Sequence, residues 1–514
     1  MRIPYHNRNS FRRTVCLFAA ILLLALSACT YVDGNTPEPS AEESPVQNQT
    51  EQASPLPEST PALEPQYRGD GTKYTCIMTD ARDRRWEEEI VSFADTFLNY
   101  LQGHPKLTER STYVRYETSF RHPEGIYESL FDAKLREEFI RRVNLLIASI
   151  DSKSDSELLL GCSEITAILN DAHSNITLPL TEVFPLGLIP IYTDDVPEAY
   201  IYAAPTEHSE LLLCRLDAIN GVSVPEIMAR AEKLIPHESV SFVYHSLFSE
   251  SYSRFVPCLL LESGFLRYIG VLGEENVALF TVTDGNGMQH EVTLRSVVKE
   301  TKPEMTVYQP ETVIDESISF DLMYENREAS GWYKLTEGGK VLYIRLNICA
   351  DDADTLCSKA VSSAAETGEL KTVIVDLRGN PGGNNGTKEN IAEAINSLDT
   401  MESKYVLIDG GTASAAVSIA VALKRFCKDA VLVGTPAGEP PNDVFQTSGF
   451  ASSNRYIQGH ISVHKCFFEW PAYEELTLMP DITVAETAED FKNGIDSVLK
   501  YVMCDSALTV GKGE

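Results

Sequence analysis

The chain has 514 residues, of which 43% are hydrophobic and 23% are charged. This length is enough for two or three domains with buried cores, and the composition is that of a globular protein. The formal net charge of −32 at pH 7 argues against a nucleic-acid partner, because the chain lacks a basic surface that would neutralise phosphates.

The N-terminus is typical of an export signal. Arginines at positions 8, 12 and 13 precede an apolar run over residues 15–26, which is too short to span a bilayer comfortably. The next segment, Leu26-Ser-Ala-Cys29, resembles the cleavage box of bacterial lipoproteins. We therefore expect residues 1–29 to be a lipoprotein signal peptide and Cys29 to carry a lipid that anchors the exported body to the cell-envelope membrane. A plain signal peptide or an uncleaved anchor is the alternative.

Residues 30–67 predict an extended tether between the anchor and the body. Seven prolines and no lysine or arginine occur between residues 31 and 66. Such a segment cannot bury enough apolar surface to fold.

Nine of the eleven cysteines lie beyond Cys29, and none of them forms a C-x-x-C pair. This spacing gives no support to a zinc or redox site, and we expect no metal or cofactor. Most of these cysteines are expected to be small buried residues, although one or two disulfides are possible after export.

Residues 68–178 are predicted to be helical. Apolar side chains recur at helical spacing in three stripes, and Ser154 with Glu157 forms a capping box at the start of the third helix. The three stripes are Trp86, Ile90, Phe93 and Phe97; then Phe139, Val143, Leu146 and Ile150; then Leu158, Cys162, Ile165 and Leu169.

Residues 179–300 change to short β-type runs. Within them, residues 216–234 have the order of a strand, an Asn-Gly turn, a strand and a helix. This order favours a small, degenerate PDZ-like module.

Residues 331–503 alternate strands with helices, after a connection over residues 301–330 and before a tail over residues 504–514. Strands are expected over residues 341–346, 372–377, 405–408 and 430–433, with helices over 354–365, 388–398 and 414–426. This alternation predicts an α/β fold with a mainly parallel sheet, whose ligands bind at the carboxyl ends of the strands.

Two of these strand ends carry groups suited to acyl transfer. One strand runs into Gly382-Gly383, and the next leads to Ser414 and Ala415 at the start of a helix. Ser414 offers a hydroxyl, while the N–H of Ala415 and that of Gly382 or Gly383 could bind an oxyanion. The simpler alternative is that Ser414 or Thr412 only caps the helix.

Five segments carry recognisable motifs: Asp376-Leu-Arg-Gly-Asn-Pro-Gly-Gly383, Gly411-Thr-Ala-Ser-Ala415, Val433-Gly-Thr-Pro436, Pro480-Asp-Ile-Thr-Val484 and Leu169-Asn-Asp-Ala-His-Ser174. Together they resemble the tail-specific, or C-terminal-processing, serine protease family. The resemblance covers roughly residues 80–500 and implies a crotonase/ClpP-like α/β protease core, a PDZ-like domain and a helical N-terminal part. It implies that Ser414 is the nucleophile and that Gly382, Gly383 and Ala415 form the oxyanion hole.

The chain departs from one branch of that family at the general base. That branch places a lysine about 25 residues after the serine, whereas residues 434–442 contain none. Lys424 and Lys428 are expected to be solvated charges. The branch that uses a histidine and an acid has an Asp-Ala-His segment, which implies that His173 is the base. His460 and His464 are alternatives.

The resemblance implies a glutamate six residues before Pro480, which is Glu474; Glu475 and Glu469 remain alternatives. Val417 stands where many relatives carry a glutamate, which places activity in doubt. Asp376 and Arg378 are expected to fix the strand end rather than to transfer protons.

We therefore expect a lipid-anchored, extracytoplasmic serine endopeptidase that binds an extended peptide and uses a Ser-His-Glu triad. The alternatives are a catalytically inactive peptide-binding lipoprotein and a non-peptidase hydrolase on the same fold. The sequence leaves the oligomeric state and the substrate open.

Overall fold

The computed structural model describes residues 81–103, 133–178, 182–192, 196–248, 258–310, 316–398, 403–441, 444–466 and 477–510. The expected signal peptide with Cys29, the tether and the three candidate acids Glu469, Glu474 and Glu475 lie outside these residues.

Three helices near the N-terminus bury the predicted apolar stripes. They are α2 (Ala81–Gly103), α3 (Ala133–Ile147) and α4 (Asp155–Ala167). The ring of Phe93 lies 5.0 Å from that of Phe97 and 6.0 Å from that of Phe139, measured between centroids. The capping box is confirmed, because Ser154 Oγ accepts from the Glu157 N–H and Glu157 accepts from the Ser154 N–H.

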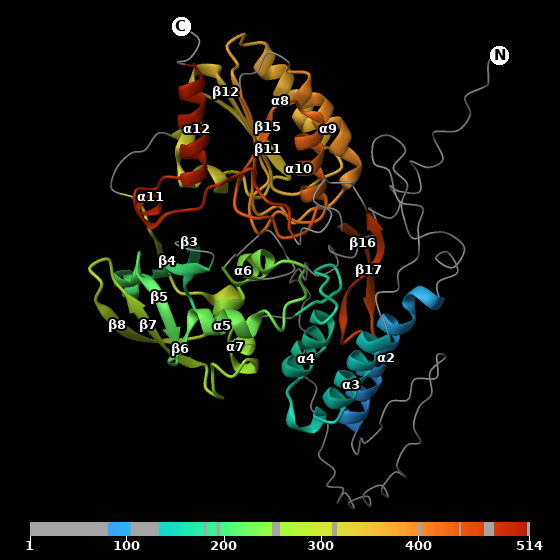
Figure 1. Cartoon of the computed structure of the whole chain (residues 1–514). Helices are drawn as coiled ribbons and strands as arrows, with labels where there is room; N and C mark the ends of the chain where they lie inside the picture. The colour runs from blue at the N-terminus through green and yellow to red at the C-terminus, as the bar shows by residue number, and fades with distance from the viewer. Residues whose placement is uncertain are drawn as a thin grey trace, which may run out of the picture. The chain divides into compact units, whose positions relative to one another are not determined.

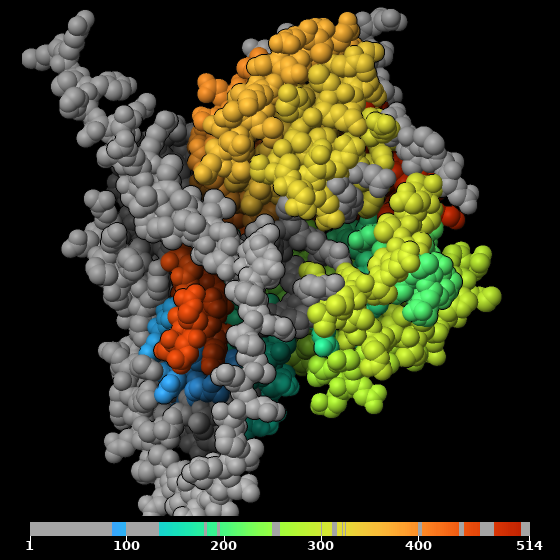
Figure 2. Space-filling model, turned by 180° about the vertical axis from the view of Figure 1, so that it is seen from behind, coloured from blue at the N-terminus to red at the C-terminus, as the bar shows by residue number. Residues whose placement is uncertain are grey.

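A hairpin from the C-terminal part of the chain packs on these helices. Strands β16 (Val444–Ala451) and β17 (Gln458–Cys466) pair antiparallel, and β17 also pairs with β1 (Asn175–Ile176). Ile457 and Ile461 are buried among the apolar side chains of α2, α3 and α4. In Figures 1 and 2 the orange hairpin lies beside the blue helix α2. Segments more than 350 residues apart thus share one core.

One buried carboxylate fastens the hairpin turn to α2. Glu89 accepts hydrogen bonds from the backbone N–H groups of Asn454 and Tyr456 at 2.7 and 3.0 Å, and also from the Ser452 hydroxyl. Burial opposes ionisation of Glu89, but these donors hold its pKa below the ordinary value.

The middle region contains an antiparallel sheet with the strand order β10-β4-β5-β7-β8, in which β3 also pairs with β4 and β6 with β5. The turn between β5 and β6 is made by Asn220 and Gly221, both at positive φ. The predicted order of strand, turn, strand and helix over residues 216–234 is confirmed. The elements are β3 (Gly187–Tyr192), β4 (Pro197–Pro205), β5 (Arg215–Ile219), β6 (Val222–Ser223), α5 (Val224–Ala231), α6 (Val240–Phe248), α7 (Ser263–Tyr268), β7 (Val277–Thr283), β8 (Gln289–Arg295) and β10 (Met305–Val307). A further pair, β2 (Glu182–Val183) with β9 (Val297–Val298), forms a two-stranded sheet.

The α/β region contains a six-stranded sheet with the order β11-β12-β13-β14-β15-β18. β11 is antiparallel to β12, and the other neighbours are parallel, as the alternation of strands and helices predicts. The strands are β11 (Gly331–Thr336), β12 (Val341–Leu346), β13 (Thr372–Asp376), β14 (Ser403–Ile408), β15 (Ala430–Gly434) and β18 (Ile482–Thr483).

Helices cover both faces of this sheet (Figure 1). On one face α8 (Ala353–Ala365), α9 (Lys388–Asn396) and α10 (Ala415–Phe426) pack against alternate strand residues such as Val373 and Val375. On the other face α12 (Ser497–Val510), which follows the short α11 (Ala488–Lys492), packs against the intervening residues, such as Ile374. Both faces are apolar, which explains why these strands have continuous hydrophobic sequences.

The protein is therefore a mixed α/β structure with several sheets. Among the described residues six cysteines are buried and one, Cys504, is exposed, and none of the seven forms a disulfide. In the same residues we find no helix whose length and apolarity would let it cross a membrane.

Candidate active site

Ser414 lies in the turn between β14 and α10, in a backbone conformation that residues other than glycine rarely adopt. Its φ is 52° and its ψ is −122°, and it is partly exposed between the buried residues Ala413 and Ala415. Such strain costs on the order of 1–3 kcal/mol and persists only where the surroundings enforce it. A sharp strand-to-helix turn of this kind is typical of serines that act as nucleophiles.

Asp409 joins the Ser414 turn to the glycine loop that follows β13. Its Oδ1 accepts hydrogen bonds from the backbone N–H groups of Gly379 at 2.7 Å and Gly411 at 2.9 Å. The Thr412 hydroxyl donates to the Leu377 carbonyl at 2.9 Å, which makes a second link. Two parallel strands thus end in loops that are fixed to each other.

The Gly382-Gly383 segment lies directly against Ser414. A β carbon added at Gly382, whose φ is 99°, would come within 2.5 Å of Ser414 Cβ and 2.9 Å of the Ala415 nitrogen. The Gly382 N–H donates to Asn380 Oδ1 at 2.9 Å, so it is already engaged.

The N–H groups of Gly383 and Ala415 are the two that remain for an anion beside Ser414. Around Gly383 the backbone pairing uses the Gly382 carbonyl and the Asn384 N–H, both bonded to Cys349. Ala415 is the first residue of α10, where an N–H has no partner within the helix. Neither N–H donates a hydrogen bond to any group in the described part of the chain. This pair of donors is suited to bind a developing oxyanion.

Helix α6 of the middle region packs closely against the turn that contains Ser414. A β carbon at Gly410 would come within 2.4 Å of the Ser241 carbonyl oxygen, and one at Gly411 within 2.3 Å of the His245 ring. Burial lowers the pKa of His245, and the charge of Asp409 opposes that shift. The turn can approach α6 this closely only because it has glycines there.

His173 lies in a tight turn that follows α4 and leads into β1. Its N–H donates to Asp171 Oδ1 at 2.9 Å, and the Ser174 hydroxyl accepts from the Ser462 N–H of β17 at 3.1 Å. The His173 side chain is 12% exposed. Asp171 thus stabilises this turn from within, and the β17 strand of the hairpin stabilises it through a hydrogen bond to Ser174.

Glu439 connects His173 to the Ser414 turn. Its Oε2 accepts the Ser414 N–H at 2.6 Å, and its Oε1 lies 3.5 Å from His173 Nδ1. Glu439 is 2% exposed. Burial raises its pKa and the charge of Asp171 adds to this, whereas His173 and the Ser414 N–H act in the opposite direction.

Two further carboxyl groups lie beside His173. Asp171 and Glu238, which precedes α6, each place an oxygen within 4.8 Å of a His173 ring nitrogen and of each other. Burial raises the pKa of Glu238 well above its ordinary value, and the charges of Glu439 and Asp171 raise it further.

Asp376 and Arg378 belong to a separate cluster of buried ion pairs at the carboxyl end of β13. Asp376 accepts from the Tyr343 hydroxyl at 2.7 Å and pairs with Arg345 at 2.8 Å and Arg378 at 2.7 Å. Arg378 also pairs with Asp496 at 2.8 Å. Burial opposes ionisation of Asp376, but Arg378 and Arg345 hold its pKa far below the ordinary value. These contacts agree with a structural role for both residues.

The structure brings together most of the predicted site residues. Ser414, Ala415 and the two glycines meet at one point, and Glu439 links that point to His173. Burial lowers the pKa of His460, and the proximity of His173 adds to this shift. The side chain of His464 lies outside the described part of the structure.

One prediction needs correction, namely that Lys424 is a solvated charge, because its ammonium group donates to the Ala430 carbonyl at 2.8 Å and pairs with Asp481 at 2.7 Å. Lys428 is 87% exposed, as expected. Glu439 is a residue of the site that the sequence pattern did not single out. It follows Ser414 by 25 residues, the position at which the other branch has its lysine, and that coincidence could have identified it.

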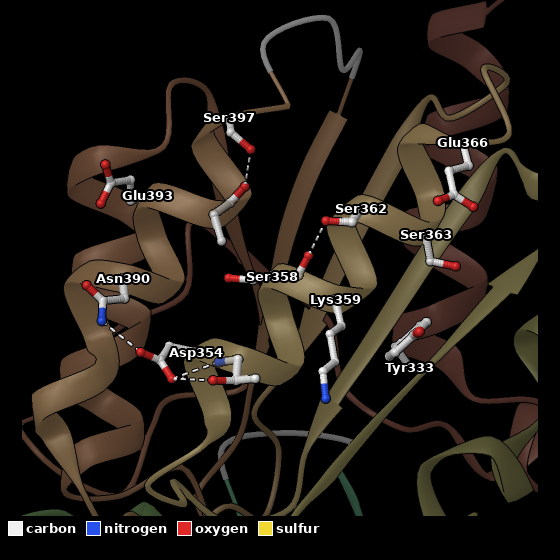
Figure 3. Close-up of a pocket in the computed structure, with 12 residues that line it drawn as sticks. Tyr333, Asp354, Ser358, Lys359, Ser362, Ser363, Glu366, Asn390, Glu393 and Ser397 are labelled. Carbon is white, nitrogen blue, oxygen red and sulfur yellow. Dashed lines mark hydrogen bonds between the residues drawn. The ribbon is translucent and has the colours of Figure 1, made fainter.

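A pocket of about 870 Å³ lies elsewhere, between α8 and α9 (Figure 3). Its lining is polar and includes Asp354, Ser358, Ser362 and Asn390. The Ser362 hydroxyl donates to the Ser358 carbonyl of its own helix at 2.8 Å. None of the groups around Ser414 lines this pocket.

No family model matches the chain, and no curated protein matches it in sequence. Solved structures are similar in fold. Mature CPAF complexed with lactacystin is 12% identical over 83% of this chain and 99% of that chain, with a TM-score of 0.51. A structure of mature CPAF is 13% identical over 73% and 92%, with a TM-score of 0.49. The photosystem II D1 C-terminal processing protease is 13% identical over 82% and 98%, with a TM-score of 0.36.

The similarity to the CPAF complex extends over nearly the whole of that chain. At this level of identity it concerns the fold alone. This chain therefore shares a mixed α/β fold with CPAF, and its chemistry has to be argued from its own residues.

Proposed function

We propose that this protein is a serine endopeptidase that hydrolyses peptide bonds in extended or C-terminal segments of proteins. The observation that carries the proposal is the position of Glu439, which accepts the Ser414 N–H at 2.6 Å and lies 3.5 Å from His173 Nδ1. A strained serine, a histidine and a buried carboxyl group are thereby gathered at the N-terminus of α10. The fold shared with CPAF and the motifs of the tail-specific protease family support the same proposal.

In the proposed reaction His173 accepts the proton of the Ser414 hydroxyl as the oxygen attacks the peptide carbonyl carbon. The N–H groups of Gly383 and Ala415 bind the oxyanion of the tetrahedral intermediate. His173 then returns the proton to the leaving amine, and water hydrolyses the acyl-enzyme. Gly382 contributes by its small size, because its own N–H donates to Asn380.

We assign the orientation of His173 to Glu439, because its Oε1 lies 3.5 Å from His173 Nδ1 while its Oε2 accepts the Ser414 N–H at 2.6 Å. Glu474, with Glu475 and Glu469 as its alternatives, stays a prediction outside the described residues. A variant at each position distinguishes the two assignments.

The proposed architecture is that of the family in the finer details as well. The six-stranded region would be the crotonase/ClpP-like protease core, and the antiparallel middle region the PDZ-like module. Residues 1–29 would be the signal peptide and Cys29 the lipid attachment site, so that the enzyme is anchored at the cell envelope through residues 30–67.

The test is covalent labelling of the full chain, purified in detergent, with a fluorophosphonate probe. We expect the wild type to be labelled, and Ser414→Ala and His173→Ala to lose the rate of labelling by about 10⁴-fold or more. Ser418→Ala is the matched control, because Ser418 lies one turn further along α10 and is buried. Glu439→Gln should reduce labelling strongly and Glu474→Gln only slightly.

Labelling that survives Ser414→Ala would refute the nucleophile, and a strong loss in Glu474→Gln with none in Glu439→Gln would reverse the assignment of the acid. If the folded wild type neither reacts nor cleaves peptides, the alternative of an inactive peptide-binding lipoprotein takes the place of the enzyme.

A further inference from the structure

Two buried carboxyl groups beside His173 form no ion pair with a lysine or arginine of the described residues. Asp171, His173 and Glu238 each place a possible ligand atom within 4.8 Å of the other two. Buried carboxylates are ordinarily paired with cations or bind metals, so this arrangement is costly as it stands.

The orientation of Asp171 points to a missing partner. Asp171 is 2% exposed; its Oδ1 accepts the His173 N–H at 2.9 Å, whereas its buried Oδ2 has no hydrogen-bond partner among the described residues. The carboxylate oxygens of Glu238 are also shielded from solvent, and the polar groups that face them are the backbone N–H groups of Ala172 and of Glu238 itself, which oppose the rise in its pKa. A bound cation would satisfy all of these oxygens at once.

We propose that Asp171, His173 and Glu238 bind a divalent transition-metal cation such as Zn²⁺, and that the bound cation inhibits the protein. The inhibition rests on the proposed function, in which His173 is the base. The metal-binding site rests only on the positions of the three side chains and does not depend on that function.

The set of donors favours zinc over the alkaline-earth ions. Zinc accepts imidazole nitrogen and carboxylate oxygen as ligands, and with a water these three groups could complete a tetrahedral site. Mg²⁺ and Ca²⁺ prefer oxygen ligands alone and in larger number. The three ligand atoms already lie within 4.8 Å of one another, although they come from two segments, the turn after α4 and the residues before α6.

Coordination of either ring nitrogen would remove the basicity of His173. If Nε2 binds the ion, its lone pair is no longer available. If Nδ1 binds the ion, the neutral ring carries its proton on Nε2, which then cannot accept another. Binding at Nδ1 would also displace the contact with Glu439, which is 3.5 Å away.

The binding test uses the full chain with Ser414→Ala and Cys504→Ser, which abolish turnover and remove an exposed thiol. Zn²⁺ is titrated in competition with a chromophoric chelator. We expect one tight site, an affinity loss of about tenfold or more in Glu238→Gln, and no change in Glu232→Gln. Glu232 is the matched control because it is an exposed glutamate near the C-terminal end of α5. Equal affinities in these two variants, or equally strong competition by Mg²⁺, would overturn the site.

The inhibition test measures fluorophosphonate labelling of the protein with Ser414 intact. Zn²⁺ should suppress labelling reversibly, with a half-inhibitory concentration at least about tenfold higher in Glu238→Gln. Labelling that is unaffected at saturating Zn²⁺ would overturn the inhibition. Absence of labelling even without Zn²⁺, together with tight binding in the first test, would refute the proposed function and leave the metal site intact.

Discussion

Asp376 and Glu439 are both buried carboxyl groups at the edge of the six-stranded sheet, and their surroundings differ in charge. Asp376 has two arginines and a tyrosine hydroxyl around it, and its pKa is lowered. Burial raises the pKa of Glu439 and the nearby carboxyl group of Asp171 adds to this, although His173 and the Ser414 N–H act in the opposite direction. The arginines around Asp376 compensate its charge and hold the strand end in place. Around Glu439 the carboxyl groups outnumber the cationic groups.

This contrast distinguishes a buried carboxyl group that stabilises the fold from one that serves a functional site. A buried carboxylate that faces two arginines, as Asp376 does, stabilises one conformation and stays ionised. Carboxyl groups with raised pKa values around a histidine cost stability, and proteins retain them where the site has chemical work to do or a ligand to bind. The comparison therefore predicts opposite effects when the two kinds of carboxyl group are neutralised.

The largest effect is expected from Asp376→Asn. It leaves Arg345 and Arg378 buried without their shared anion, which should cost about 3–5 kcal/mol of unfolding free energy. Because the folded pKa of Asp376 is lowered, its contribution is present above the unfolded pKa and is lost as the pH falls, so the difference should shrink below about pH 4. Urea unfolding of this variant and of the exposed control Asp352→Asn measures it. A loss no greater than that of the control would contradict the structural role.

A smaller loss is expected from Glu89→Gln. The amide would present an N–H group to donors that now bond to a carboxylate, at a cost of about 1–3 kcal/mol. Hydrogen exchange should show faster opening of the β16–β17 turn. Glu88→Gln, the exposed neighbour, serves as the control, and equal exchange rates in the two variants would argue against this anchor.

The smallest effect, and the opposite sign, is expected from Glu238→Gln. The folded pKa of Glu238 is raised, so the wild type loses stability as the pH rises from the unfolded pKa through the folded one. The variant should therefore be more stable than the wild type by about 1 kcal/mol at pH 8 and no more stable near pH 4. Denaturant midpoints at both pH values, with Glu232→Gln alongside, test this; destabilisation at pH 8 would place Glu238 among the structural carboxylates.

Local patterns predicted much of the fold. The strand over residues 341–346, the C-terminal end of the helix at Phe426 and the capping box at Ser154 agree with the structure. Each depends on neighbours within a few residues, because periodicity and capping are local properties. The antiparallel pairing of β11 at the sheet edge and the packing of the hairpin on α2 depend on distant contacts, and the sequence did not predict them.

The sequence predicted the part of the candidate site around Ser414 but not the contact between Glu439 and His173. The glycine pair and Ser414 occur in dense motifs, and the structure places them together. Glu439 lies in a loop of prolines and glycines without periodicity, and its relation to His173 arises only from the fold. At the position where one branch of the family has a lysine, this chain has the opposite charge, the carboxyl group of Glu439.

Because α6 contacts Gly410 and Gly411, the middle region and the region of the six-stranded sheet are not structurally independent of each other. The same helix also lies against Gly438, where a β carbon would come within 3.1 Å of the Phe242 ring. Gly410 and Gly411 of the Ser414 turn and Gly438, next to Glu439, therefore all lie against α6, a helix that the sheet region does not contain. A fragment limited to residues 331–503 would keep its nucleophile in sequence and lose the support that shapes it.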